Sequence, residues 1–249
     1  MRGALGCSDR GHSAASQMKP GDVDWDQIFG VGGARWFHTG GVFSALSPGT
    51  RELATQAMQA ARRHGTVVSY DLNFRASLWQ HADVLPAEVN RQLLQHADVV
   101  IGNEEDYSAA LGYVLEGVNS DLLDLDAATY AEMLGQVLAD FPGLAIAAAT
   151  LRQVRTASVN DWSGVCRTRT SFHEGPRMAG LEILDRIGGG DSFVSGLTYG
   201  LLAGFDVGTA LAFGTAHGAL VMTTPGDTSM ATLAEVRRLA AGRSARVIR

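Results

Sequence analysis

The sequence predicts an α/β fold, with a mainly parallel sheet and helices on both of its faces. Short apolar runs at 66–70, 98–101 and 144–149, the first of them β-branched, have the length of buried parallel strands. Segments with apolar residues at helical spacing alternate with them. The 249 residues, 46% hydrophobic and 18% charged, suffice for a full core, so we expect one domain over residues 1–249.

The first half of the chain supplies three of the expected strands. Acids after Pro20 predict a turn into a short helix, and residues 35–39 read as a strand. Ser47 and Pro48 begin a helix that ends at the pair 64–65. The remaining elements of this half are strands at 66–70 and 98–101 and helices at 86–97 and 104–111.

The second half begins with residues 112–129, which lack periodicity and are expected to form a loop. A polar run at 160–164 predicts the turn of a hairpin over 158–170. The other expected elements are strands at 144–149 and 181–184 and helices at 130–141, 192–203, 207–222 and 231–241. His217 has no second ligand at helical spacing, which favours a helix-face histidine over a metal ligand.

Composition and charge exclude several classes of partner. A formal net charge of −6 without a basic block argues against nucleic acid, which needs clustered Lys and Arg. Cys7 and Cys166 form no metal-ligand spacing and favour a reducing cytoplasm. No apolar run reaches the roughly 20 residues of a membrane span, and residues 1–20 lack a secretory apolar core. We therefore expect a cytoplasmic protein without a membrane partner.

Residues 181–202 carry the most informative pattern in the chain. An apolar strand enters a helix through Gly188, Gly189 and Gly190, whose bare backbone lets an anion approach the helix N-terminus. Asp191 follows directly, and a carboxylate beside a phosphate site can deprotonate a hydroxyl that attacks the phosphoryl group. The alternative is a tight turn in which Asp191 only caps the helix, and these four residues alone do not decide between the two.

Polar residues also follow two of the expected strands, where ligands of open parallel sheets bind. Asp71, Asn73 and Arg75 offer an acceptor, an amide and a planar cation that suit a carboxylate or hydroxyl groups. Alternatively, they cap the next helix and pair with one another. Asn103 ends the next strand and precedes the acids at 104–106, which the helix dipole alone can explain.

The run D-R-I-G-G-G-D-S-F-V-S-G at 185–196 resembles the signature D-x-x-G-A-G-D-x-F-x-x-G of the ribokinase-like (PfkB) carbohydrate kinases. Two stretches look most like the 2-keto-3-deoxygluconate kinases of this family. They are the residues of this run itself and the pattern D-x-N-x-R at 71–75, which is followed by Leu78 and Trp79. The resemblance implies a ribokinase-like three-layer α/β/α sandwich. It also implies transfer of the ATP γ-phosphoryl group to the primary hydroxyl of a sugar acid.

The resemblance assigns roles to these residues. By it, Asp191 is the catalytic base, and Gly188, Gly189 and Gly190 stabilise charge on the transferred group. Asp71, Asn73 and Arg75 bind the substrate, and Arg10 is the second cation for its carboxylate. In the family an N-x-x-E motif organises Mg²⁺ through water. Here Asn103 corresponds to the asparagine of that motif, and either Asp106, at the same spacing, or Glu105 corresponds to its acid. Thr150, Arg152 and Gly226 would border the nucleotide. Asp185 would help to bind a monovalent cation such as K⁺.

The resemblance leaves alternatives open. The chain is expected to lack the family's first strands, a substrate-binding glycine motif and a β-lid, so a non-catalytic nucleotide-binding remnant is one alternative. A PfkB kinase for fructose, ribose or a nucleoside is another. The implied partners are a small sugar acid and ATP. A homo-oligomeric state is compatible with the sequence. A Rossmann dehydrogenase is disfavoured because its glycine motif follows an early strand.

Overall fold

The computed structural model describes residues 10–80, 82–113 and 127–242. Contacts divide the chain into two compact units. The first unit consists of residues 4–115 and 135–147, and the second is built chiefly from residues 148–249. Each unit is coherent by itself, and the single domain expected over 1–249 stays a prediction.

The first unit contains three parallel strands in chain order, β1 (Trp36–Gly40), β2 (Val67–Asp71) and β3 (Val99–Gly102). Its helices are α1 (Gly41–Ala45), α2 (Pro48–Arg63), α3 (Ala76–Trp79), α4 (Pro86–Leu94) and α5 (Glu104–Leu111). A short 3₁₀ turn at Ala15–Gln17 and a π-helical turn at Gln27–Gly33 precede β1. The predicted strands and the predicted helix at 48–63 are confirmed.

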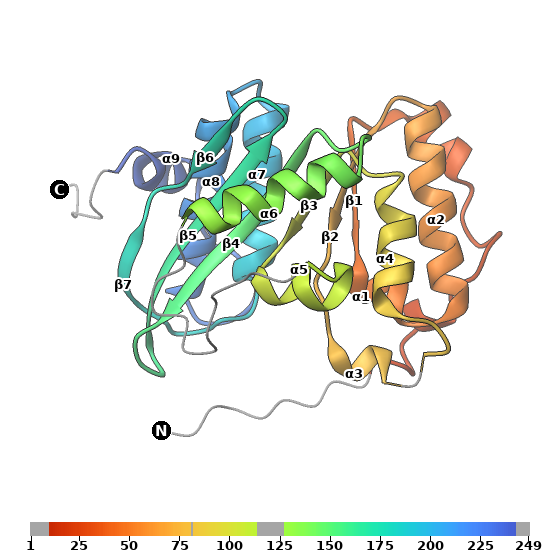
Figure 1. Cartoon of the computed structure of the whole chain (residues 1–249), viewed down its shortest axis with the longest axis horizontal. Helices are drawn as coiled ribbons and strands as arrows, with labels where there is room; N and C mark the ends of the chain where they lie inside the picture. The colour runs from red at the N-terminus through yellow and green to blue at the C-terminus, as the bar shows by residue number, and fades with distance from the viewer. Residues whose placement is uncertain (1–9, 81, 114–126, 243–249) are drawn as a thin grey trace. The chain divides into compact units, whose positions relative to one another are not determined.

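Helix α2 follows directly from its sequence signals. Ser47 accepts a hydrogen bond from the backbone N–H of Thr50, and Pro48 occupies the first helical turn. Its buried side includes Leu53, Ala57 and Ala61. In Figure 1, α2 and α4 lie side by side on the strands of this unit.

Tyr70 connects β2 to two helices of the first unit. The side chain is fully buried, and its hydroxyl donates a 2.6 Å hydrogen bond to Oδ1 of Asn90 on α4. The Ser44 hydroxyl of α1 lies 2.9 Å from the same oxygen. Burial raises the pKa of Tyr70 well above its ordinary value, so this polar group stays neutral. These bonds fix the orientation of β2, whose last residue is Asp71.

The second unit combines a largely antiparallel sheet with a helical pair. Its elements are β4 (Ile146–Val154), β5 (Val159–Thr168), β6 (Phe172–Glu174), β7 (Met178–Glu182), α7 (Gly189–Leu202), α8 (Val207–Met222) and α9 (Leu233–Ala240). Helix α6 (Ala127–Asp140) contributes to both units. Strands β6 and β7 pair antiparallel with β5. None of the helices in the described ranges is long and apolar enough to cross a membrane.

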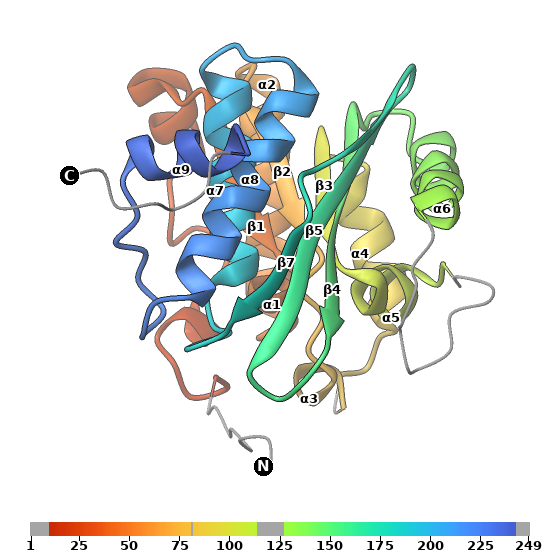
Figure 2. The ribbon, with the colours of Figure 1, turned by 90° about the vertical axis from the view of Figure 1, so that its left-hand side faces the viewer.

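Glycines allow α7 and α8 to pack closely, as Figure 2 shows for the two neighbouring helices. A Cβ atom at Gly200 would lie 2.6 Å from Cα of Ala210, and one at Gly196 would lie 2.6 Å from the carbonyl oxygen of Phe213. Helix α8 in turn packs on β5. Helix α7 is therefore held in place by its close packing on α8.

The predicted hairpin over 158–170 is wrong, because these residues form the continuous strand β5. Asn160 and Asp161 are buried within the sheet, and a register shift beside β7 accommodates them. Gly164 is required for packing, since a Cβ there would lie 2.5 Å from the Phe193 ring. The chain turns instead after β4, where Arg155 and Thr156 both donate backbone N–H groups to the Val159 carbonyl.

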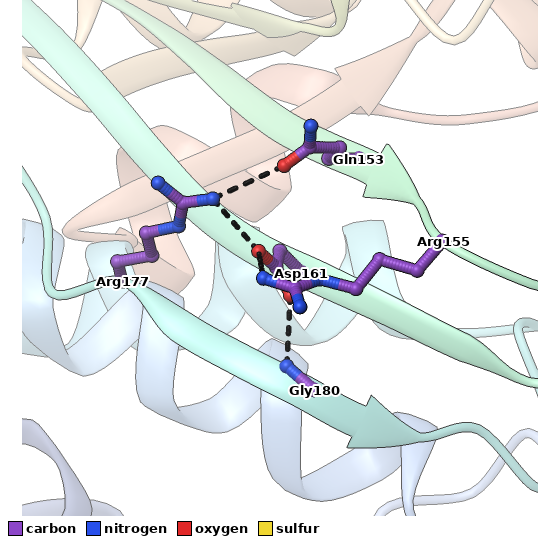
Figure 3. A network of polar contacts seen from close by, with 5 residues as sticks. All are labelled: Gln153, Arg155, Asp161, Arg177 and Gly180. Atoms are coloured by element: carbon purple, nitrogen blue, oxygen red, sulfur yellow. Dashed lines mark hydrogen bonds and ion pairs between the residues drawn. The ribbon is translucent and has the colours of Figure 1, made fainter. Parts of the chain in front are cut away.

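A buried carboxylate ties β5 to its neighbours (Figure 3). The Asp161 side chain is 4% exposed, and its Oδ2 accepts hydrogen bonds from Arg155 (2.7 Å) and Arg177 (2.8 Å). Its Oδ1 accepts the backbone N–H of Gly180 on β7 at 2.8 Å, while Arg177 also donates to Gln153 on β4. Arg155, with help from Gly180 and Arg177, holds the pKa of Asp161 well below its ordinary value. This network joins β4, β5 and β7.

Replacing Asp161 by Asn is expected to lower the free energy of unfolding at pH 7 by about 1–3 kcal/mol, because a buried charged acceptor is lost. The folded-state pKa lies below the unfolded value, so the unfolded chain takes up the proton first as pH falls. The stability from Asp161 is thus fully present above a pH of roughly 4 and is lost progressively as the pH falls from there toward the lowered folded-state pKa. Urea unfolding at pH 7 and at about pH 2, well inside that range, measures both effects.

Glu182→Gln, on the exposed part of β7, is the control and should change stability by no more than about 0.5 kcal/mol. An Asp161→Asn protein with the same stability as the wild type at pH 7 would contradict the structural role of the network.

Candidate active site

The glycine loop forms the beginning of helix α7. Gly188 is the N-cap residue with φ = +82°, and the first helical residue is Gly189. A Cβ at Gly188 would also lie 2.9 Å from the carbonyl oxygen of Asp227. Both the left-handed backbone and the close approach require glycine here. The predicted helix therefore begins three residues earlier than expected, because the loop itself supplies the first turn.

The other two glycines differ in their surroundings. Gly189 is buried, and a Cβ there would lie 3.1 Å from the Met222 side chain. Gly190 is exposed, and a Cβ there would meet nothing within 4 Å. No side chain in the described part of the chain caps this helix end. The first N–H groups of α7 therefore remain available to an anion, which the positive end of the helix dipole also favours.

Asp191 lies in the first turn of α7 and is exposed. The alternative in which its carboxylate caps the helix is wrong, because the N-cap is Gly188 and no side chain bonds to the free N–H groups. Within the described residues, no hydrogen bond or ion pair engages this carboxylate. Asp191 is thus an unengaged carboxylate one residue beyond the open, uncapped start of α7.

Two further predicted residues come together beside this loop. Oδ1 of Asp185 accepts the backbone N–H of Ile187 at 3.0 Å. The backbone N–H groups of Leu184 and Asp185 point to the Met222 carbonyl, at 2.9 and 3.4 Å. The segment after Met222 contains the exposed Gly226 and returns to Gly188 through Asp227. Asp185 and the loop around Gly226 therefore flank the glycine loop.

His217 of α8 links helix α7 to the same loop region. Its Nδ1 lies 2.9 Å from the Ser195 hydroxyl of α7, and its Nε2 lies 2.7 Å from the Ser229 hydroxyl. Burial lowers the pKa of this half-buried histidine. With both ring nitrogens engaged, His217 is the satisfied helix-face histidine that the sequence predicts. Its contact with Ser229 was not foreseeable, because the two residues are brought together only by the turn after α8.

Thr150 and Arg152 lie two residues apart on β4 and so share one face of that strand. Thr150 is half-buried and Arg152 is exposed. A role beside the nucleotide stays a prediction for both.

In the first unit, β2 ends in the predicted D-x-N-x-R residues. Asp71 is 8% exposed, and its Oδ1 accepts the backbone N–H of Asn73 at 3.1 Å. Asn73 adopts a left-handed backbone with φ = +33°, and its buried Oδ1 has no hydrogen-bond partner among the described residues. Arg75 is exposed and donates a 2.7 Å hydrogen bond to the Phe74 carbonyl. A strained backbone and an unpaired amide oxygen together are typical of ligand sites.

The two glycines at the junction of β1 and α1 lie close to the same loop, and the sequence shows them as the pair at 40–41. A Cβ at Gly40 would lie 2.7 Å from the Asp71 carbonyl oxygen, and one at Gly41 would overlap the Leu72 carbonyl. The missing side chains let the end of β1 approach the loop after β2.

The carboxylate of Asp106 is engaged by the backbone. Its Oδ1 accepts the Phe74 N–H at 2.7 Å, and its Oδ2 accepts the Asn103 N–H at 2.9 Å. In return, Oδ1 of Asn103 accepts the Asp106 N–H at 2.8 Å. Burial raises the pKa of Asp106 despite these two bonds. Glu105, by contrast, is exposed.

The oxygen atoms of these side chains limit how Mg²⁺ could be bound. No group of three His, Cys, Asp or Glu side chains in the described ranges could form a metal cluster. An exposed Glu105 and the side chain of Asn103 suit an ion that keeps most of its waters and binds phosphate oxygens. The residues therefore fit water-mediated Mg²⁺ and do not form a closed protein cage.

Arg10 is half-exposed, and its carbonyl accepts hydrogen bonds from the N–H and the hydroxyl of Ser13. The pairing of Arg10 with Arg75 at one carboxylate stays a prediction.

Comparison with known proteins finds similarity to carbohydrate kinases. The model of the pfkB family carbohydrate kinases matches residues 162–233, which include the glycine loop. A 2-dehydro-3-deoxygalactonokinase of Haloferax volcanii is 32% identical over 97% of this chain and 67% of its own length. The 2-dehydro-3-deoxygluconokinase structure from Thermotoga maritima superimposes with a TM-score of 0.82 at 35% identity, covering 93% of this chain and 66% of that one.

A ribokinase II structure from Escherichia coli in complex with ATP and Mg²⁺ has a TM-score of 0.71 at 17% identity, with 94% of this chain and 67% of that chain covered. At that identity the likeness concerns the fold alone. The chain spans about half to two thirds of the length of the curated relatives it matches. The ribokinase-like α/β fold expected from the sequence is confirmed, and the chain belongs to the PfkB family of carbohydrate kinases.

Proposed function

We propose that this chain carries the phosphoryl-transfer site of an ATP-dependent kinase that acts on a 2-keto-3-deoxy sugar acid. The observation that carries the proposal is the unengaged Asp191 carboxylate next to the uncapped, open start of α7. The Haloferax and Thermotoga relatives are named as kinases of 2-dehydro-3-deoxy sugar acids, which supports the substrate class.

In the proposed reaction, Asp191 accepts the proton of the primary hydroxyl as its oxygen attacks the γ-phosphorus of ATP. A new oxygen–phosphorus bond forms, the bond to the β,γ-bridging oxygen breaks, and ADP leaves. The backbone N–H groups at Gly189 and Gly190 stabilise the negative charge on the transferred group. Mg²⁺ would neutralise phosphate charge, with Asn103 and Glu105 as the residues that orient its waters. A K⁺ ion beside Asp185 and the loop at Gly226 belongs to the same proposal.

The substrate carboxylate is assigned to Arg75. An exposed guanidinium supplies a planar pair of donors for a carboxylate. A neutral sugar has no carboxylate to accept them. The unpaired Oδ1 of Asn73 can accept a substrate hydroxyl, and Asp71 holds Asn73 in place.

The test is ADP formation with ATP, Mg²⁺ and each of four acceptors: 2-keto-3-deoxygluconate, 2-keto-3-deoxygalactonate, fructose and ribose. We expect kcat/KM for the two acids to exceed that for the neutral sugars by about 100-fold, as for other losses of a charged contact. Comparable rates with fructose or ribose would refute the sugar acid assignment. Binding of ATP without turnover of any acceptor would indicate a non-catalytic protein.

A pair of glycine variants tests the anion site. Gly190→Ala adds a methyl group in open space, so we expect little change in Tm but a roughly 10- to 100-fold loss of kcat from impeded phosphate approach. Gly188→Ala, at φ = +82° and against the Asp227 carbonyl, should lower the free energy of unfolding by more than about 1 kcal/mol. Thermal denaturation and ADP formation distinguish the two. A fully active Gly190→Ala enzyme would exclude this loop as the phosphate site.

A further inference from the structure

We propose that Asp106 is a positioning residue that holds the loop 71–75, and hence Arg75 and Asn73, in the substrate-binding conformation. The role of this loop in substrate binding rests on the proposed function. The family pattern instead points to the acid at this spacing as an organiser of Mg²⁺. The contacts of Asp106 favour the positioning role.

Both oxygens of the Asp106 carboxylate bond to the backbone. One accepts the N–H of Phe74, from the loop after β2, and the other accepts the N–H of Asn103, at the start of α5. The residue is 5% exposed, so these hydrogen bonds are shielded from water. Asp106 thus connects the ends of two parallel strands through one side chain.

The loop needs such a restraint because its backbone is strained. Asn73 has φ = +33°, a backbone conformation that residues with a Cβ seldom adopt and that local hydrogen bonds can stabilise. Two carboxylates stabilise this backbone conformation by accepting hydrogen bonds from it. Asp71 binds the N–H of Asn73, and Asp106 binds the N–H of the next residue, Phe74. If the second bond is removed, the loop can relax and Arg75, one residue further, is displaced.

The same contacts make Asp106 less suited than Glu105 to orient water bound to Mg²⁺. Its buried carboxylate already serves two N–H donors, whereas the neighbouring Glu105 is exposed and carries no such bonds. Any orientation of Mg²⁺-bound water by the first turn of α5 is therefore assigned to Glu105.

Amide hydrogen exchange, followed residue by residue by NMR, tests the restraint without relying on activity. In the wild type the Phe74 amide is expected to be protected, and in Asp106→Asn and Asp106→Ala it should exchange at least about 10-fold faster. Asn103→Ala is the matched control. It removes the cap of α5 but leaves the bond between Asp106 and Phe74, so Phe74 exchange should change by less than about 2-fold.

Fast exchange of Phe74 in the wild type, or unchanged exchange in the isosteric Asp106→Asn, would overturn the proposal. The wild-type measurement decides even if both Asp106 variants fail to fold.

Kinetics then separate positioning from metal binding. For Asp106→Asn we expect KM for 2-keto-3-deoxygluconate to rise about 10-fold while the Mg²⁺ concentration for half-maximal rate stays within about 2-fold of the wild type. Glu105→Gln should show the reverse pattern. A shift of Mg²⁺ dependence in Asp106→Asn, without a change in KM, would overturn the positioning role. If the wild type turns over no sugar acid, the proposed function fails, while the exchange result still decides whether Asp106 restrains the loop.

Discussion

Replacing Asp191 by Asn is expected to lower kcat by about 100- to 10,000-fold, the range typical for removal of a positioned general base. The carboxylate is exposed and unengaged among the described residues, so the fold should not depend on it. An amide of the same size cannot accept the hydroxyl proton, although it can occupy the same position beside the glycine loop. ADP formation under saturating ATP and sugar acid measures the loss.

Two observations control this experiment. The Tm of Asp191→Asn should match that of the wild type, and its affinity for ATP should change little, because only the proton acceptor is lost. Glu182→Gln, an equal change of charge on the exposed part of β7, should retain wild-type kcat. An Asp191→Asn protein with at least half of the wild-type kcat, measured as about a 2-fold change or less, would remove Asp191 from the mechanism.

Replacing Arg75 by Ala is expected to raise KM for 2-keto-3-deoxygluconate by about 10- to 100-fold, the equivalent of one lost charge-assisted hydrogen bond. Its only hydrogen bond that the structure describes goes to the adjacent Phe74 carbonyl, so little stability is lost with it. Any residual rate with fructose should not change, because a neutral sugar has no carboxylate for the guanidinium. Initial rates over a range of each acceptor measure the effect.

Arg62→Ala, which removes an exposed arginine paired with Asp98, is the matched control and should leave both KM values unchanged. Arg75→Lys should recover only part of the affinity, since an ammonium group lacks the planar pair of donors. Equal losses for the acid and the neutral sugar would show that Arg75 maintains the loop and does not select the substrate.

Much of the fold was predictable because its signals are local. The helix at 48–63 has an N-capping serine, a proline in its first turn and a stop at His64 and Gly65, and the structure confirms it. Helix α8 was predicted with its observed bounds. The buried strands were recognisable because an apolar, β-branched run between helices has few other uses.

The hairpin at 158–170 shows where local reasoning fails. Asn, Asp, Ser and Gly within five residues are typical of a turn, yet here they lie inside strand β5. Asp161 can be buried because arginines before and after it in the chain neutralise it, and Gly164 is small because Phe193 packs on it. Neither partner is visible from the residues around the motif.

The sequence by itself determined the α/β fold, the position of the glycine loop and the set of polar residues at the strand ends, since periodicity, caps and glycine runs act over a few residues. Only the tertiary structure decided what each polar group does. Asp191 is unengaged and Asp106 is bonded to the backbone, although both lie in the first turn of a helix. The reason is physical: the state of a carboxylate depends on its burial and on the N–H groups facing it, and for Asp106 one of these groups belongs to Phe74, which is distant in the chain.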